Sequence, residues 1–126
     1  MPFRTPLIFP LLLLLLTACS KQSKEDLAIA RTPKEAASQI DQAFVAANAA
    51  TKQAAAAASE ALRKGDYEQA VVSLQVVRSS PEITVEQGFA IHSSTVAMEA
   101  RLISAMESGD KNAERAYQLL KAMKKK

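Results

Sequence analysis

Cys19 and His92 are the strongest candidates for nucleophilic or metal chemistry, because the chain of 126 residues has one cysteine and one histidine. A Ser/His/Asp or Cys/His centre would have to use His92, whose helical neighbours include Ser93 and, two turns further on, Glu99. A metal held by His92 and Glu99 would need ligands from elsewhere, because no HxxxH, HExxH or CxxC spacing occurs. The sequence therefore predicts no catalytic residue, no metal site and no cofactor, and it places His92 at the edge of the core or in solvent.

Carboxylate-pair and phosphate-loop chemistry also has little support in the composition. Catalytic carboxylate pairs, as in glycosidases, need a cleft with flanking aromatic side chains around the scissile bond. Aromatic residues make up only 5% of this chain, and tryptophan is absent. The 3 glycines are scattered, and Gly88 falls inside a predicted helix, so there is no glycine-rich phosphate loop. We therefore predict that this protein is not an enzyme.

Cys19 follows directly behind an apolar run. The first residues carry one cation, Arg4, and an apolar stretch over residues 7–16 then leads to Thr17 and Ala18. This order of charge, apolar run and small residues is typical of a secretory signal peptide. About ten apolar residues rise ~15 Å as a helix, which is half of the ~30 Å needed to cross the hydrocarbon core. Residues 1–18 are therefore predicted to be a signal peptide that exports the chain.

The four residues "LTAC" (16–19) resemble the lipobox of bacterial lipoproteins. The resemblance covers the first 20 residues and implies a lipid thioether on Cys19, cleavage before it, and acylation of the new amino terminus. In lipoproteins of this type, Ser20 rather than an acid at the next position favours the periplasmic side of the outer membrane. Several acyl chains together give stable membrane anchoring. An ordinary secreted protein with an incidental cysteine is the alternative.

The two ends of the expected mature chain are polar. Residues 19–32 are predicted to be the lipidated N-terminus and a flexible tether that spans on the order of 20 Å. The formal net charge is +3, and cations gather at the other end in Lys121, Lys124, Lys125 and Lys126. Such a tail suits a helix C-terminus. The expected partners are the membrane, through the lipid anchor, and another envelope protein, with no nucleic acid; a homo-oligomer stays open.

From residue 33 onward the chain predicts an all-α domain over residues 33–126. Helix formers dominate, and "TPKE", "DYEQ" and "TVEQ" carry N-cap patterns at Thr32, Asp66 and Thr84. Breaks are expected at Gly65, at residues 79–82 and at Gly109. Asn48 is a poor interior residue, so a bend or break is favoured there, with Thr51 as a second N-cap. The resulting helices cover residues 33–64, 67–79, 84–108 and 111–124.

The helix predicted over residues 84–108 is apolar on two sides. Its first stripe contains Val85, Phe89, Val96, Ala100 and Ile103, and its second contains Ile91, Met98, Leu102 and Ala105. A helix that is apolar on two sides is usually buried between neighbours. If the domain lacks one of those neighbours, one stripe is a docking face for a partner. The candidate interaction face consists of Tyr67, Leu74, Ile91, Met98 and Leu102.

Two stretches share the order helix, Gly-Asp, helix, with Gly65 and Gly109 at equivalent places. Glycine ends one helix in the left-handed conformation and aspartate caps the next, so each stretch predicts an αα-hairpin. The first resembles a tetratricopeptide (TPR) repeat over residues 51–81, although Ala54 and Ala57 stand where that motif has Trp and Leu. The resemblance implies a surface that binds peptides or proteins without catalysis. The residues that carry it are Ala58, Gly65, Asp66, Tyr67, Ala70, Leu74, Val77 and Pro81.

The expected fold is therefore a small bundle of two αα-hairpins, TPR-like, with four to five helices. A true TPR array usually needs three or more repeats, so a compact bundle is at least as well supported. The leading functional hypothesis is a membrane-anchored, non-catalytic interaction module. The alternative is a resemblance to murein lipoproteins, in which Lys126 would be joined to peptidoglycan and the alanines of residues 46–61 would form an oligomer seam. The Gly-Asp turns and Pro81 break the single long helix that such proteins use.

Overall fold

The structure is a computed structural model that describes residues 28–126, and within this range it contains five α-helices and no strand. The all-α prediction is confirmed for this part of the chain. The predicted signal peptide and Cys19 lie outside the described residues. None of the five helices is long and apolar enough to span a membrane. The helices are α1 (Pro33–Ala43), α2 (Ala49–Lys64), α3 (Tyr67–Arg78), α4 (Val85–Glu107) and α5 (Lys111–Lys124).

Local capping explains where the helices begin. The side chains of Thr32 and Asp66 accept hydrogen bonds from backbone N–H groups three residues further on, each at 3.2 Å. Thr84 forms a full capping box with Gln87, in which each side chain bonds the other residue's backbone N–H at 3.1 Å. These bonds satisfy N–H groups that have no partner inside the helix. The three predicted N-caps are confirmed.

The break expected near Asn48 is present, but its cap differs from the prediction. α1 ends at Ala43, and Asn48 caps α2 by accepting a hydrogen bond from the Thr51 N–H at 2.9 Å. Thr51 as N-cap is therefore wrong. Its hydroxyl instead lies 3.1 Å from the Ser80 hydroxyl, in the connection that follows α3. Asparagine is among the preferred N-cap residues, and here it starts α2.

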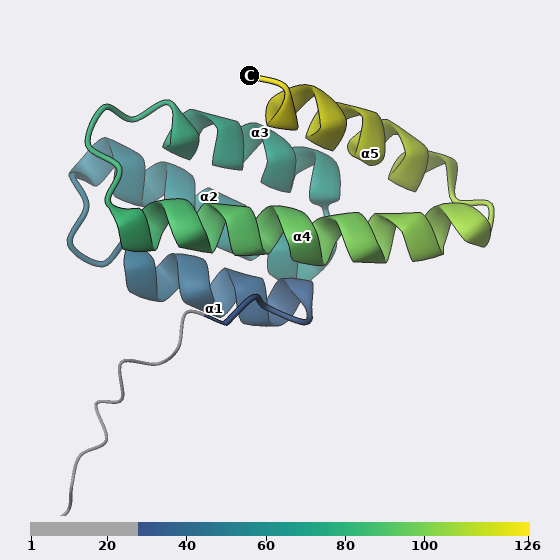
Figure 1. Ribbon diagram of the computed structural model, residues 1–126, viewed down its shortest axis with the longest axis horizontal. Helices are drawn as coiled ribbons and strands as arrows, with labels where there is room; N and C mark the ends of the chain where they lie inside the picture. Colours follow the sequence, from purple (N-terminus) through teal and green to yellow (C-terminus); the bar gives the residue numbers. More distant parts are fainter. Residues whose placement is uncertain (1–27) are drawn as a thin grey trace, which may run out of the picture.

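The five helices alternate in direction and close into a bundle (Figure 1). α1 packs against α2 and α4, α3 packs against α2 and α5, and α4 packs against α5, with a smaller contact between α3 and α4. The helices of each predicted hairpin, α2 with α3 and α4 with α5, pack against each other. The two pairs meet mainly through α3 and α5, since α2 and α4 make no contact with each other within residues 28–126. The result is a compact bundle in which α1 fills the space between the first helices of the two hairpins.

Small residues let α2 approach its neighbours closely. Ala55, Ala58 and Ala61 of α2 are buried in the bundle's own core, facing the helices α1 and α3 that pack against α2. The oligomer seam predicted over residues 46–61 is thus replaced, for these three alanines, by contacts within the chain. Larger side chains supply most of the buried apolar area. The largest fully buried hydrophobic side chains are Ile40, Leu62, Leu74, Met98, Leu102 and Leu120, with Phe44 at 2% exposure.

The end of the predicted tether is part of the fold. Ala30 is 4% exposed, and its N–H donates a hydrogen bond of 2.7 Å to the buried Ser93 hydroxyl of α4. The Gln39 side chain of α1 donates another, also of 2.7 Å, to the Ala28 carbonyl. Residues 28–32 therefore occupy the seam between α1 and α4, and the boundary predicted at residue 33 is wrong by at least five residues. The remainder of the predicted tether, residues 19–27, lies outside the described residues.

Candidate functional site

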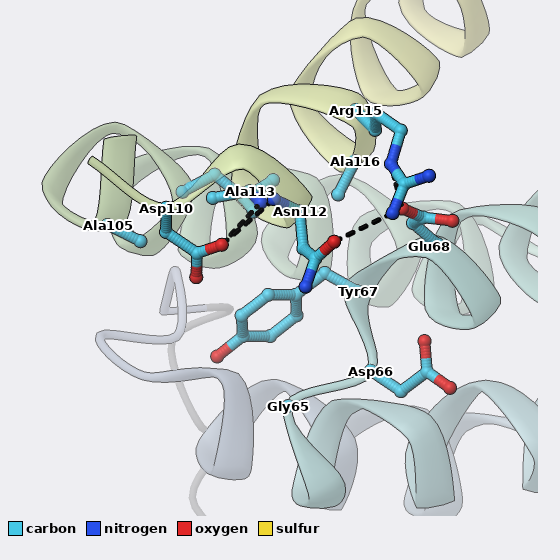
Figure 2. A pocket seen from close by; sticks show the side chains of 11 residues that line it. Gly65, Asp66, Tyr67, Glu68, Ala105, Asp110, Asn112, Ala113, Arg115 and Ala116 are labelled. Carbon is cyan, nitrogen blue, oxygen red and sulfur yellow. Dashed lines mark hydrogen bonds and ion pairs between the residues drawn. The ribbon is translucent and has the colours of Figure 1, made fainter. Parts of the chain in front are cut away.

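The two Gly-Asp turns lie at the same end of the bundle and frame an open cleft of about 370 Å³ (Figure 2). One wall comes from the α2–α3 turn, where Gly65 has φ 75°, and the other from the α4–α5 turn, where Gly109 has φ 84°. Both values lie in the left-handed region that glycine adopts without a steric penalty. The repeat seen in the sequence thus becomes a pair of facing turns.

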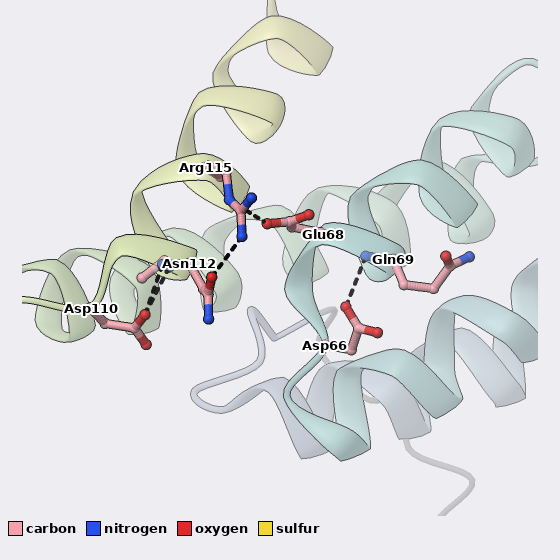
Figure 3. Close-up of polar contacts among 7 residues, drawn as sticks. Asp66, Glu68, Gln69, Asp110, Asn112 and Arg115 are labelled. Atoms are coloured by element: carbon pink, nitrogen blue, oxygen red, sulfur yellow. Dashed lines mark hydrogen bonds and ion pairs between the residues drawn. The ribbon is translucent and has the colours of Figure 1, made fainter.

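Asp66 and Asp110 start the two helices that leave these turns. One carboxylate oxygen of Asp66 accepts from the Gln69 N–H at 3.2 Å. One oxygen of Asp110 accepts from the N–H groups of Asn112 and Ala113, at 2.9 and 3.2 Å. Figure 3 shows both caps. These bonds satisfy backbone N–H groups at the starts of α3 and α5, the two helices that leave the turns.

Tyr67 is the largest side chain of the cleft. It is half-buried, packs against the hydrophobic core, and extends its ring between the two turns (Figure 2). Apolar side chains from α4 and α5 complete the base of the cleft: Leu102, Ala105, Ala113 and Ala116. The combination of an aromatic ring with a hydroxyl and an apolar base is well suited to hold part of another molecule.

The rim of the cleft is charged. The Arg115 guanidinium donates a 2.7 Å hydrogen bond to the Asn112 side-chain oxygen, and its Nε lies 3.3 Å from a Glu68 carboxylate oxygen (Figure 3). This ion pair links α5 to α3, but it is exposed and worth at most ~1 kcal/mol. The carboxylates of Asp66, Glu68 and Asp110 outnumber the single cation among the lining residues, so the rim favours a positively charged partner group.

The five residues of the predicted interaction face do not form one accessible surface in the structure. Tyr67 and Leu102 both line the cleft, Tyr67 as a partly exposed side chain and Leu102 at 0% exposure. Leu74, Ile91 and Met98 are at most 6% exposed and, like Leu102, belong to the hydrophobic core. As an accessible face, this part of the prediction is wrong, because α1, α3 and α5 cover that side of α4. Burial in the core, the other interpretation, holds for the stripe that contains Ile91, Met98 and Leu102, whereas Val85, Val96 and Ile103 of the first stripe are exposed.

His92 is exposed, as the sequence predicts. It lines a second open cleft of about 460 Å³, together with Arg78, Met123 and Lys124. The Glu99 carboxylate, which the sequence places two turns from His92, accepts a 2.8 Å hydrogen bond from the Lys124 ammonium. Within residues 28–126, no group of three or more His, Cys, Asp or Glu side chains is arranged to hold a metal ion.

Sequence reasoning missed the polar rim. Glu68, Asn112 and Arg115 carry no motif, and they meet because α3 packs against α5. The signal that could have found them is the repeated Gly-Asp turn, since residues that follow equivalent turns come close together when two hairpins pack side by side with their turns at the same end. The chain matches no protein-family model, and no curated protein or solved structure is significantly similar to it.

Proposed function

We propose that this protein is an exported bacterial lipoprotein whose helical domain binds another envelope protein without catalysing a reaction. Residues 1–18 are its signal peptide, and Cys19 anchors it by lipid to the periplasmic side of the outer membrane. The signal-peptide pattern and the lipobox resemblance support the anchor. The observation that carries the binding function is the cleft between the two Gly-Asp turns, with the half-buried Tyr67 inside it.

The dimensions and chemistry of this cleft suit a protein segment. A volume of about 370 Å³ is at the small end of ligand sites, which typically hold roughly 300–1,000 Å³. It therefore accommodates one or two side chains that project from a partner surface. Tyrosine supplies a large contact area at low cost in conformational entropy, which is why it is enriched at interfaces. The acidic rim selects a partner residue such as Lys or Arg.

The TPR-like sequence pattern also supports a protein-binding function. It implies protein binding without catalysis, and the residues that carry it include Gly65, Asp66 and Tyr67, which line the cleft. In our proposal these positions therefore serve both the hairpin turn and the binding surface.

Photocrosslinking in living cells tests the binding function. A photoreactive phenylalanine analogue replaces Tyr67 in the full-length protein, and a matched variant carries it at Tyr117. Tyr117 is also half-buried, and Lys121 Nζ lies 5.5 Å from the centroid of its ring. We expect a crosslink to a distinct envelope protein at position 67 and at least ten-fold less at position 117. Equal crosslinking at both positions would contradict the proposed site.

A charge reversal then tests the rim. Arg115→Glu makes the rim more acidic and should strengthen capture of a basic partner, whereas Glu68→Lys should weaken it. Arg101→Glu, an exposed substitution on α4 outside the cleft, serves as the control. Identical crosslinking yields for all three variants would show that the rim does not select the partner.

The anchor has its own test. Cells labelled with radioactive palmitate should incorporate label into the wild-type protein, which should fractionate with the outer membrane. Cys19→Ser should abolish both the label and the membrane fractionation, while Ser20→Asp should keep the label and shift the protein to the inner membrane. A Cys19→Ser protein that still carries palmitate would refute the lipid anchor.

The murein-type alternative has less structural support. Such lipoproteins use one long helix, whereas here the chain folds back four times into a bundle of five helices within residues 28–126. Digestion of purified sacculi distinguishes the two functions, since a muropeptide bound to a peptide of residues 111–126 would favour attachment through Lys126.

A further inference from the structure

We propose that the outer stripe of α4, defined as Val85, Phe89, Val96, Ala100 and Ile103, is a surface for self-association, where α4 of a second copy packs antiparallel. This stripe faces away from the core. Val85 is 86%, Val96 37% and Ile103 40% exposed, Phe89 is partly exposed, and Ala100 is exposed. A row of large apolar side chains along one exposed helix face usually marks an interaction site.

The spacing of the stripe matches a helix pair. Phe89 and Ile103 lie seven residues before and seven residues after Val96. Such a heptad spacing keeps apolar side chains along one line of contact with a second helix. In an antiparallel pair with its two-fold axis at Val96, Phe89 of each copy meets Ile103 of the second copy, and the two Val96 side chains meet at the centre. These three residues of the stripe are therefore self-complementary, as an isologous interface requires.

The edge of the stripe that faces α5 carries a hydrogen-bond donor and an acceptor that match across the two-fold axis. His92 and Glu99 both lie on this edge, and Glu99 is held there by Lys124 of α5 at 2.8 Å. The same two-fold axis brings His92 of each copy to the level of Glu99 in the second copy, within one residue. An imidazole N–H can then donate a hydrogen bond to the Glu99 carboxylate, and the symmetry produces this contact twice. Such pairs fix the register of an interface.

The exit of the N-terminal segment favours the antiparallel pair over a parallel one. Ala30 bonds to Ser93 at the edge of the stripe that faces α1, and Figure 1 shows residues 28–32 running beside α1. In an antiparallel pair the two-fold axis is perpendicular to both helices, so the two segments lie on the same side of the dimer. In a parallel pair the axis runs along the helices, and the segments lie on opposite sides.

Two lipid-anchored copies need their N-terminal segments on the same side of the dimer. This step rests on the proposed lipid anchor. The eight residues 20–27 separate Cys19 from the described segment, and at ~3.3–3.6 Å per residue the stretch from Cys19 to Ala28 reaches at most roughly 30–32 Å. With both segments on one side, both lipidated cysteines reach the same bilayer. Ile29, next to Ala30 in the chain, is a further large apolar side chain in this segment and is 41% exposed.

The size of the stripe predicts a weak interaction that the membrane strengthens. α4 has 23 residues, so at 1.5 Å per residue it is about 35 Å long. One pair of such helices buries less than the roughly 1,200–2,000 Å² of a stable interface. Anchoring two copies in one bilayer raises their effective concentration, and the second contact then becomes favourable.

Cysteine crosslinking in cells tests the dimer, because Cys19 is consumed by the lipid and leaves no other thiol. In the full-length protein, Val96→Cys places two thiols at the two-fold axis. Val76→Cys is the control, since Val76 is 59% exposed on α3 and lies off the stripe. After mild oxidation we expect at least ten-fold more disulfide dimer from Val96→Cys than from Val76→Cys. Equal yields, or a disulfide between the Val96→Cys variant and a different protein, would overturn the proposal.

A pair of variants tests the direction of the helices. Phe89→Cys and Ile103→Cys expressed separately should give little dimer, and expressed together they should give a mixed disulfide. Strong dimers of Phe89→Cys alone would indicate a parallel pair and overturn the antiparallel one.

The same experiment in a Cys19→Ser background separates this proposal from the anchor. If the anchor exists, dimer yield falls by at least ten-fold while the preference for position 96 over position 76 persists. If the anchor proposal fails, palmitate labelling is absent, and the same preference in the Cys19→Ser background, where the introduced cysteine is the one thiol of the chain, still supports the dimer. Loss of the preference in both backgrounds would overturn the dimer alone.

Discussion

The two apolar stripes of α4 have similar side chains and opposite environments. On the inner stripe, Met98 and Leu102 are fully buried, whereas Val96 and Ile103 of the outer stripe are 37% and 40% exposed. Leu102 and Ile103 are adjacent in sequence and almost equal in hydrophobicity. The difference arises because α1, α3 and α5 all cover one side of α4 and no helix within residues 28–126 covers the other. Apolar periodicity thus identifies a two-sided helix, but it does not say which side the domain itself covers.

The largest expected effect comes from truncating these neighbours one at a time. Leu102→Ala should lower the free energy of unfolding by about 3 kcal/mol, because it removes buried methylene groups and leaves a cavity. Ile103→Ala should change it by less than about 1 kcal/mol, because its side chain is partly in water and alanine is the better helix former. Urea denaturation of the two variants measures the contrast. Equal losses would show that the two stripes are not as different as the structure indicates.

A smaller effect is expected at the edge of the outer stripe, in the seam that holds the N-terminal segment. Ser93→Ala should cost roughly 1–3 kcal/mol, because it leaves the buried Ala30 N–H without the acceptor that it has at 2.7 Å. The control is Ser94→Ala, since the buried Ser94 hydroxyl donates to the Ala90 carbonyl of its own helix. Hydrogen exchange at the Ala30 amide should accelerate in Ser93→Ala and not in Ser94→Ala. Unchanged exchange in both variants would show that the Ser93 hydroxyl does not protect the Ala30 N–H.

Gly88 lies between the two stripes and offers a gain in stability. A Cβ atom there would meet only Ile83 Cγ2, at an ordinary 3.8 Å, so Gly88→Ala should raise the free energy of unfolding by about 0.5–1 kcal/mol. Gly109→Ala is the opposite case. Its φ of +84° puts an alanine in the left-handed region, at a cost of about 1–2 kcal/mol. Thermal unfolding should therefore shift in opposite directions for the two variants, and shifts of the same sign would contradict the local geometry.

The smallest expected effect concerns an exposed ion pair on α2, between Glu60 and Lys64. The Lys64 ammonium, by hydrogen bond and then by charge, lowers the pKa of Glu60, and the two groups lie 2.6 Å apart. A lowered folded-state pKa contributes stability above the unfolded-state pKa, and this stability is lost as pH falls through the folded-state value. Because both groups are fully exposed, the change in stability should be too small to detect by denaturation. NMR titration of Glu60 should give a pKa that rises in Lys64→Met, and an unchanged value would refute the pair.

The candidate site could be predicted in part. The two Gly-Asp turns and Tyr67 are visible in the sequence, because glycine and aspartate act on backbone groups within four residues of themselves. That the turns face each other across a cleft, with Glu68 reaching Arg115, depends on the packing of α3 against α5. No local pattern encodes that contact, since its members are far apart in the chain.

The sequence by itself determined where most helices begin and end, because caps and turns depend on hydrogen bonds between residues three or four positions apart. It also determined that α4 has two apolar sides. Only the tertiary structure decided which side is buried, and that residues 28–32 join the core through a bond that spans 63 positions. The physical reason is that burial depends on which helices meet, and that choice is made by the packing of the whole bundle rather than by any single segment.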